Sequence, residues 1–159
     1  MRRLIVMCGA PGCGKSTYAV DIVNEMWSKG EKAAVISTDF IREYLLGDAS
    51  CQLFGNKVFA EAEKQIRNYL YQDFTVVFDA MNLRPKDRKW VLKIAKDCGV
   101  DTVECHYFTT PLEVCIKRQD TRERKVPENV IVKKYNAMVI PSVDEGFTAV
   151  IPVKYTETK

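Results

Sequence analysis

The sequence has few of the features that mark membrane or secreted proteins. It contains no apolar run near the roughly 18 residues that a transmembrane helix needs. Arg2 and Arg3 precede an apolar stretch, as in a signal peptide, but Pro11 and Gly12 interrupt it and Lys15 follows. The net charge of +3 is too small to indicate a nucleic-acid partner by itself. We therefore expect a cytoplasmic protein that has no membrane association.

Patterns of cysteine and histidine that bind metals are also lacking. No two of the six cysteines have C-x-x-C spacing, and Cys8, Cys98, Cys105 and Cys115 fall on apolar faces. They are interpreted as buried free thiols of a reducing compartment. His106 is the only histidine and has no cysteine or histidine at ligand spacing, so we interpret it as structural.

The composition that remains is that of an ordinary globular domain. Of the 159 residues, 47% are apolar and 28% are charged, and we find no internal repeat, low-complexity tract or interdomain linker. A chain of this length buries about two-thirds of its unfolded surface. We predict one domain over residues 1–159.

Residues 9–17 read GAPGCGKST and fit the pattern G-x-x-x-x-G-K-[ST] of a phosphate-binding loop, or P-loop. The glycines let the backbone turn and bring its N–H groups close to an anion. Lys15 can reach the β- and γ-phosphates of a nucleotide, and the Ser16 hydroxyl can bind Mg²⁺. An apolar strand over 4–8 and an amphipathic helix after the loop supply the required context. The predicted nucleotide-binding residues of this loop are Gly12, Cys13, Gly14, Lys15, Ser16 and Thr17.

Apolar strand patterns alternate with helical patterns along the chain. Strands are predicted at 4–8, 33–36, 75–78, 102–107 and 147–153, and helices lie between them. One of these helices is expected over 40–46, and another should begin with a capping box at Thr110–Glu113. A further helix should carry Ile131, Tyr135, Met138 and Val139 on one face. We predict an α/β three-layer sandwich with a mostly parallel five-stranded sheet and helices on both faces.

Polar residues follow two of these strands, where a parallel sheet gathers its ligands. Asp39 can orient an acceptor hydroxyl and take its proton, or it can cap the next helix. Arg42, one turn later, can bind an anion or lie in solvent. Asp79 can hold Mg²⁺ directly or through water, or it can be a loop aspartate; Asn82 follows it.

A basic segment over 117–126 is predicted to act as a lid. Arg118 and Arg122 are four residues apart, so on a helix they would point the same way and neutralise charge on the transferring phosphate. A solvated charged face is the alternative.

These residues together resemble the 5′-hydroxyl polynucleotide kinase family, one of the P-loop kinases, over nearly the whole chain. The resemblance is carried by residues 9–17, 37–42 and 79–82, by Leu83, Pro85 and Arg88, by Lys117, Arg118, Arg122, Val126 and Pro127, and by Pro141 and 144–147. The family pattern Asp-x-Thr-Asn has Met81 in place of its threonine. No phosphatase motif follows, so a kinase module alone is expected.

The resemblance implies ATP as donor, Mg²⁺ as cofactor and the 5′-OH ends of DNA or RNA as acceptors, with a role in nucleic-acid repair. By this resemblance Asp39 is the general base and Arg42 holds the adjacent acceptor phosphate. Asp79 and Asn82 complete the acceptor side, while Lys15, Arg118 and Arg122 act on the donor phosphates. No obligatory protein partner is expected.

Two other functions fit the same loop. The first is a small-molecule kinase acting on a sugar, nucleoside or nucleotide-sugar hydroxyl. The second is a nucleotide-dependent switch or ATPase subunit. Against the latter, residues 56–59 lack the aspartate of Asn-Lys-x-Asp, and Ala80 follows Asp79 where motor ATPases commonly have an acidic residue.

Overall fold

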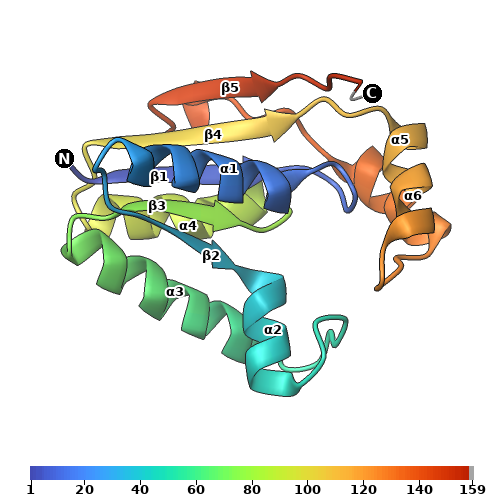
Figure 1. Cartoon of the computed structure of the whole chain (residues 1–159). Coiled ribbons are helices and arrows are strands. Elements are labelled where there is room, and N and C mark those ends of the chain that lie inside the picture. The colour runs from blue at the N-terminus through green and yellow to red at the C-terminus, as the bar shows by residue number, and fades with distance from the viewer. Residues whose placement is uncertain (158–159) are drawn as a thin grey trace.

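The computed structural model describes residues 1–157, and its centre is a sheet of five strands. They are β1 (Arg3–Cys8), β2 (Ala33–Ser37), β3 (Thr75–Asp79), β4 (Thr102–Phe108) and β5 (Ala149–Val153), in the spatial order β2-β3-β1-β4-β5. Every adjacent pair is parallel. The predicted α/β sandwich is confirmed, and the carboxyl ends of all strands lie on one side of the molecule (Figure 1).

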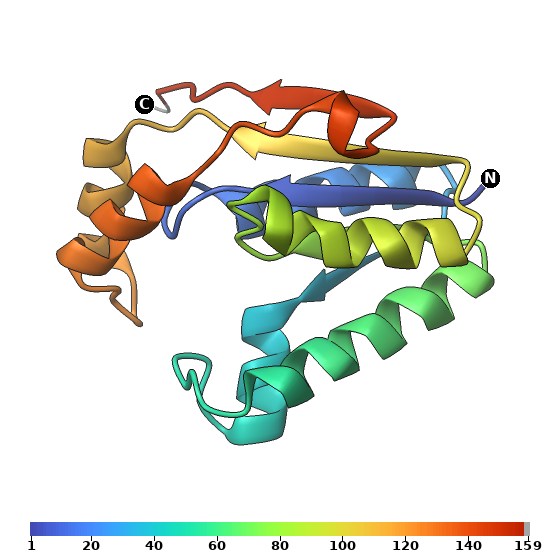
Figure 2. The same ribbon diagram turned by 180° about the vertical axis from the view of Figure 1, so that it is seen from behind.

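Helices cover both faces of this sheet. They are α1 (Lys15–Ser28), α2 (Thr38–Leu46), α3 (Gly55–Tyr71), α4 (Pro85–Asp97), α5 (Leu112–Lys117) and α6 (Glu128–Ala137), with short 3₁₀ turns η1 (Arg118–Thr121) and η2 (Val143–Glu145). Helix α1 packs on the face seen in Figure 1, and α4 covers the opposite face in Figure 2. No helix among residues 1–157 is long and apolar enough to cross a membrane.

Strand β1 shows how the sequence divides between two cores. Successive side chains of a strand point to opposite faces. Leu4, Val6 and Cys8 pack with α3 and α4, whereas Ile5 and Met7 pack with α1. All five are fully buried, as expected for a central parallel strand that is covered on both sides.

Several predicted boundaries shift for identifiable reasons. Helix α2 begins at Thr38 because the Ser37 hydroxyl accepts a hydrogen bond from the Phe40 N–H, so Ser37 is the N-cap and Asp39 is not. Helix α6 ends at Ala137, and the Val139 N–H instead donates to the Leu83 carbonyl at 2.8 Å. The last strand begins only at 149.

Arg88 on α4 is the largest fully buried side chain of the described residues. Its guanidinium binds both carboxylate oxygens of Glu145 at 2.8 and 2.9 Å, and it also donates to the carbonyls of Asn82 and Val139. This ion pair therefore joins α4, the β3–α4 turn and η2.

Candidate active site

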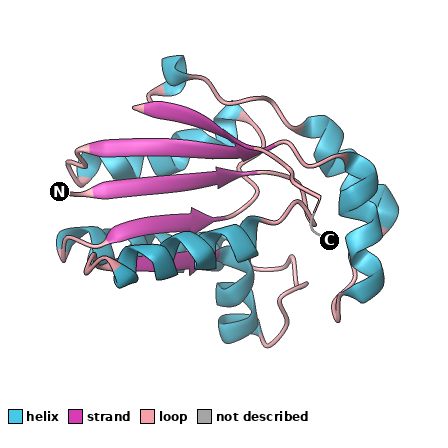
Figure 3. Cartoon of the chain, turned by 45° about the horizontal axis from the view of Figure 1, so that its top comes forward, coloured by secondary structure: helices cyan, strands magenta, loops and turns pink. Residues whose placement is uncertain are grey.

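The carboxyl ends of the strands open into one large cavity of about 1790 Å³. Figure 3 shows the strands pointing toward α5 and α6, which stand beyond the sheet edge. The P-loop, the first turn of α2, the β3–α4 turn and the lid segment all line the cavity. Its volume exceeds the roughly 300–1,000 Å³ of common ligand pockets, so it has room for more than one substrate.

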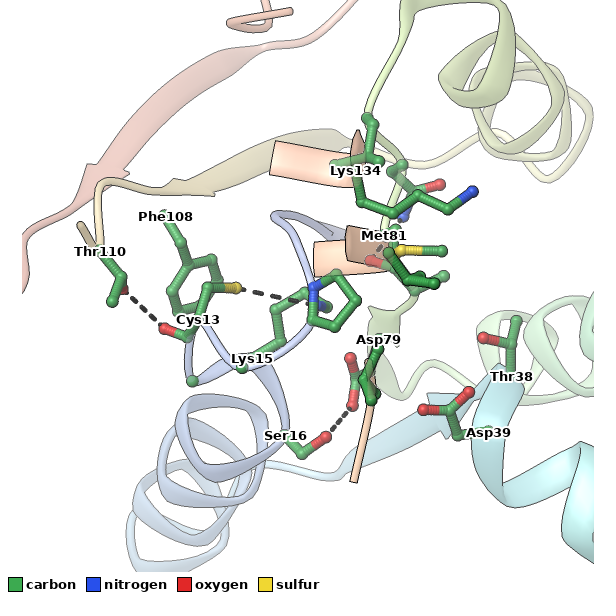
Figure 4. Close-up of a pocket in the computed structure, with 18 of the residues that line it drawn as sticks. Cys13, Lys15, Ser16, Thr38, Asp39, Asp79, Met81, Phe108, Thr110 and Lys134 are labelled. Carbon is green, nitrogen blue, oxygen red and sulfur yellow. Dashed lines mark hydrogen bonds between the residues drawn. The ribbon is translucent and has the colours of Figure 1, made fainter. Parts of the chain in front are cut away.

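Two of the three P-loop glycines have the positive φ expected of them, whereas Gly9 does not. Gly12 and Gly14 have φ values of 82° and 103°, in the region that favours glycine. A Cβ at Gly12 would also lie 2.7 Å from the Cys115 carbonyl oxygen. The Lys15 ammonium donates to the carbonyls of Gly9 and Ala10 at 2.9 and 3.0 Å, so it lies across the loop (Figure 4).

Two residues after β4 hold this loop from outside. The Thr110 hydroxyl donates to the Cys13 carbonyl at 2.8 Å, and the Arg118 guanidinium donates to the Gly12 carbonyl at 2.9 Å. The capping box predicted at Thr110 is wrong, because Pro111 is the N-cap of α5 and the Thr110 side chain binds the P-loop instead. The contact arises because β4 pairs with β1, which leads into the loop.

Ser16 and Asp79 form the pair of oxygen ligands expected near a nucleotide-bound metal. The Ser16 hydroxyl donates to the Asp79 carboxylate at 2.8 Å, and Asp79 is buried at the end of β3 (Figure 4). Burial raises the pKa of Asp79, an effect that the positive charge of Lys15 and the Ser16 hydrogen bond oppose. Described residues include no cluster of three acidic, cysteine or histidine ligands. One hydroxyl and one carboxylate nevertheless fit Mg²⁺, which proteins commonly bind through one or two carboxylates plus substrate phosphates.

On the other side of the cavity, Asp39 lies in the first turn of α2. Its carboxylate accepts hydrogen bonds from Arg42 at 3.4 Å and from Arg124 at 3.2 Å. Arg124 belongs to the lid segment, so this pair spans the cavity between elements 85 residues apart. Arg124 lies in the predicted basic segment over 117–126, but no pattern in the sequence assigns it a role, since only the folded chain brings this segment to α2.

The lid differs from its predicted form. Arg118 lies in η1, but Arg122 follows that turn with an extended backbone, so the two residues do not share one helix. Both side chains nevertheless line the cavity, and the Arg118 guanidinium also lies 5.8 Å from the centre of the Tyr155 ring.

The β3–α4 turn lies against the P-loop. The Gly9 N–H donates to the Met81 carbonyl at 2.9 Å, and Met81 lines the cavity (Figure 4). Asn82 has a φ of 46°, and its amide nitrogen donates to the Met7 carbonyl at 2.9 Å. These contacts give Asn82 a backbone-holding role; its predicted contact with the acceptor stays a prediction.

The structural interpretations of His106 and of Cys8, Cys98, Cys105 and Cys115 agree with their burial. His106 is hydrogen-bonded to Tyr18 at 2.7 Å and to Glu104 at 3.1 Å, and burial lowers its pKa despite Glu104. All six cysteines are free thiols, and all except Cys51 are buried.

Positive charge is concentrated around the cavity. Among the described residues that line it, eleven are lysine or arginine and five are aspartate or glutamate. The whole chain carries a net charge of only +3. Such a concentration attracts polyanionic ligands.

A P-loop, a hydroxyl–carboxylate pair and a basic segment at the carboxyl end of a parallel sheet are the features of a P-loop kinase fold. Residues 4–139 match the model of the AAA_33 family, described as AAA domain, and the chain belongs to this family.

Two solved structures and one curated protein show where the similarity lies. The chain is 29% identical over 143 residues to L-seryl-tRNA(Sec) kinase of Methanococcus maripaludis; the match covers 87% of this chain and 53% of that protein, so the chain spans about half its length. A chain of the Pnkp1/Rnl/Hen1 RNA repair complex has a TM-score of 0.72 at 22% identity, covering 85% of this chain and 43% of that one. Kti12 of Chaetomium thermophilum, bound to ADP-AlF₃, has a TM-score of 0.75 at 16% identity, covering 98% and 91%. At these identities the two structures establish the shared fold.

Proposed function

We propose that the protein is an ATP-dependent polynucleotide kinase that transfers the γ-phosphate to the 5′-OH of DNA or RNA. The observation that carries this proposal is the presence of Asp39 and Arg42 in the same basic cavity as the P-loop. Donor and acceptor groups bound at these two places would face each other. A family likeness to polynucleotide kinases in residues 37–42 supports the same assignment.

The donor half of the reaction is assigned to the P-loop side. The N–H groups of residues 12–17 and Lys15 bind the phosphates, and Arg118 and Arg122 neutralise charge on the transferring group. Ser16 and Asp79 would hold Mg²⁺, which when bound neutralises charge on the phosphates.

The acceptor half is assigned to the α2 side. The Asp39 carboxylate is 57% exposed, so it is accessible to an acceptor hydroxyl and can take its proton. Arg42 is only 12% exposed and, among the described residues, donates only to Asp39. Its remaining donors are suited to a phosphate of the acceptor.

An acceptor comparison tests this proposal. A nucleoside 3′-phosphate should be phosphorylated much faster than the plain nucleoside, because it carries the phosphate that Arg42 binds. Arg42→Ala should weaken oligonucleotide binding and reduce its salt slope by roughly 0.7 per lost single-strand phosphate contact. Arg122→Ala is the matched control: it should lower the transfer rate and leave the slope nearly unchanged. Equal rates with the nucleoside 3′-phosphate and the plain nucleoside, together with an unchanged salt slope of oligonucleotide binding in Arg42→Ala, would refute the polynucleotide acceptor.

The 29% identity to a kinase of L-seryl-tRNA(Sec) favours a second candidate, a hydroxyl carried elsewhere on an RNA. Both candidates use the same donor residues and the same basic cavity. Transfer of labelled γ-phosphate to seryl-tRNA, with no transfer to 5′-OH oligonucleotides, would select the second.

A further inference from the structure

A second groove of about 520 Å³ lies beside the large cavity. Its walls come from α1, β2 and α2, with Gln65 of α3 and Asp79 of β3. Five of the nine residues that line it are apolar or aromatic, among them Phe40 and Tyr44. Ser16 and Asp79 line both the groove and the large cavity. The groove therefore adjoins the residues assigned to the metal.

Two aromatic side chains of this groove are unusually exposed. Phe40 is 75% exposed and Tyr44 is 82% exposed. They are four residues apart on α2, so they lie on the same side of the helix. Among the described residues, neither ring stacks on another aromatic ring, although Tyr18, Phe59, Phe78 and Trp90 all have such partners. The two rings are therefore available to a ligand.

The charge of the groove differs from that of the cavity. No lysine or arginine is among the described residues that line the groove, and Asp79 is their one charged side chain. The cavity beside it has eleven basic residues. A ligand that spans both sites would place anionic groups in the cavity and an uncharged, flat, apolar group against Phe40 and Tyr44. A nucleic-acid strand has this pattern, with phosphates separate from bases.

We propose that the groove binds a nucleobase of the acceptor strand near its reacting end, stacked on Phe40 and Tyr44. This inference rests on the proposed polynucleotide acceptor and adds a site for its base. Asp39 and Phe40 are consecutive in the first turn of α2, so a strand whose hydroxyl meets Asp39 has the groove within the reach of a nucleotide. Stacking on aromatic side chains is tolerant of sequence, so the site would favour the presence of a base over its identity.

The test compares one 5′-OH oligonucleotide with versions of it in which one of the first two nucleotides is abasic. The parent should bind an abasic version about 5- to 150-fold more weakly, the range of one lost base–aromatic stack. Phe40→Ala/Tyr44→Ala should bind both forms equally and weakly, because the stacking platform is gone. Its KM for ATP should stay unchanged. Circular dichroism checks that it is folded, and Tyr44→Ala alone, altering the more exposed ring, should show part of the effect.

Tyr71→Ala is the matched control. Tyr71 is also exposed, at 53%, but it lies at the end of α3 near Arg2, away from both cavities. This variant should keep the parental preference for the base-bearing strand.

Equilibrium binding of the oligonucleotides is measured by fluorescence anisotropy without ATP, so the groove is tested separately from transfer. If the parent transfers no phosphate to 5′-OH ends but still binds the abasic strand more weakly, the proposed reaction is refuted and the inferred base site in the groove stands. Equal binding of the base-bearing and abasic strands by the parent would overturn the inference, as would an abasic effect that persists in the double variant. A parent dimer that dissociates on Phe40→Ala/Tyr44→Ala, without an abasic effect, would show that the groove joins two copies of the chain.

Discussion

Thr110 offers a direct test of how the P-loop is held. Its hydroxyl is buried and donates to the Cys13 carbonyl at 2.8 Å. Thr110→Val has nearly the same shape and removes only this donor. The carbonyl then loses its partner in a buried site, which costs about 1–3 kcal/mol.

The cost should be divided between ATP binding and folding. If the whole cost falls on ATP binding, the KM for ATP rises about 5- to 150-fold. If it falls entirely on folding, Tm drops by about 2–12 °C, since a domain of this size shifts about 2–4 °C for each kcal/mol. Steady-state kinetics with varied ATP and thermal unfolding measure both parts on the same preparation.

Two variants are controls for this experiment. Thr110→Ser keeps the hydroxyl and should restore most of the lost ATP affinity. Thr109→Val removes a neighbouring hydroxyl that donates to the Val153 carbonyl at 3.1 Å; that bond is exposed and does not involve the P-loop, so ATP kinetics should not change. If Thr110→Val matches the parent in both KM for ATP and Tm, the hydroxyl does not position the loop.

Three further predictions concern the carboxylates and Arg88. Asp39→Asn should lower kcat by about 10²- to 10⁴-fold, as for loss of a general base, with little change in ATP binding; a parental rate would remove Asp39 from the mechanism. Asp79→Asn should raise Tm at pH 7, because burial raises the pKa of Asp79 and the ionised form therefore destabilises the fold; the gain should vanish in acid below the ordinary aspartate pKa. Arg88→Met should cost about 3–5 kcal/mol of unfolding free energy at pH 7, because it leaves Glu145 without its buried partner. Burial opposes ionisation of Glu145, but its bonds to Arg88 and the Ser142 N–H outweigh this and lower its pKa, so the cost should shrink as pH falls through that lowered value. A pH-independent difference in chemical denaturation would contradict the last assignment.

Local patterns in the sequence were sufficient for the P-loop and for most of the sheet. The loop is readable because each of its residues has a local reason: Gly12 and Gly14 need a positive φ, and Lys15 and Ser16 need to follow them directly. The strands are readable because a strand buried on both faces is a continuous apolar run, as in Leu4 to Cys8. The burial of Cys8, Cys98, Cys105 and Cys115 followed from the same patterns.

Only the tertiary structure decided which distant residues share the cavity. Thr110 has the local signature of a helix cap. The pairing of β4 with β1 brings its hydroxyl to the P-loop instead, where it donates to the buried Cys13 carbonyl. Arg124 meets Asp39 because the lid crosses to α2, and no spacing in the sequence encodes that approach. In the sequence, Phe40 and Tyr44 are ordinary residues of a predicted helix. The structure places them, exposed, in one groove with Ser16 and Asp79. Local patterns indicate the conformation of neighbouring residues. These contacts instead depend on the order of the strands in the sheet, which is fixed only when the whole chain packs its helices against both faces of the sheet.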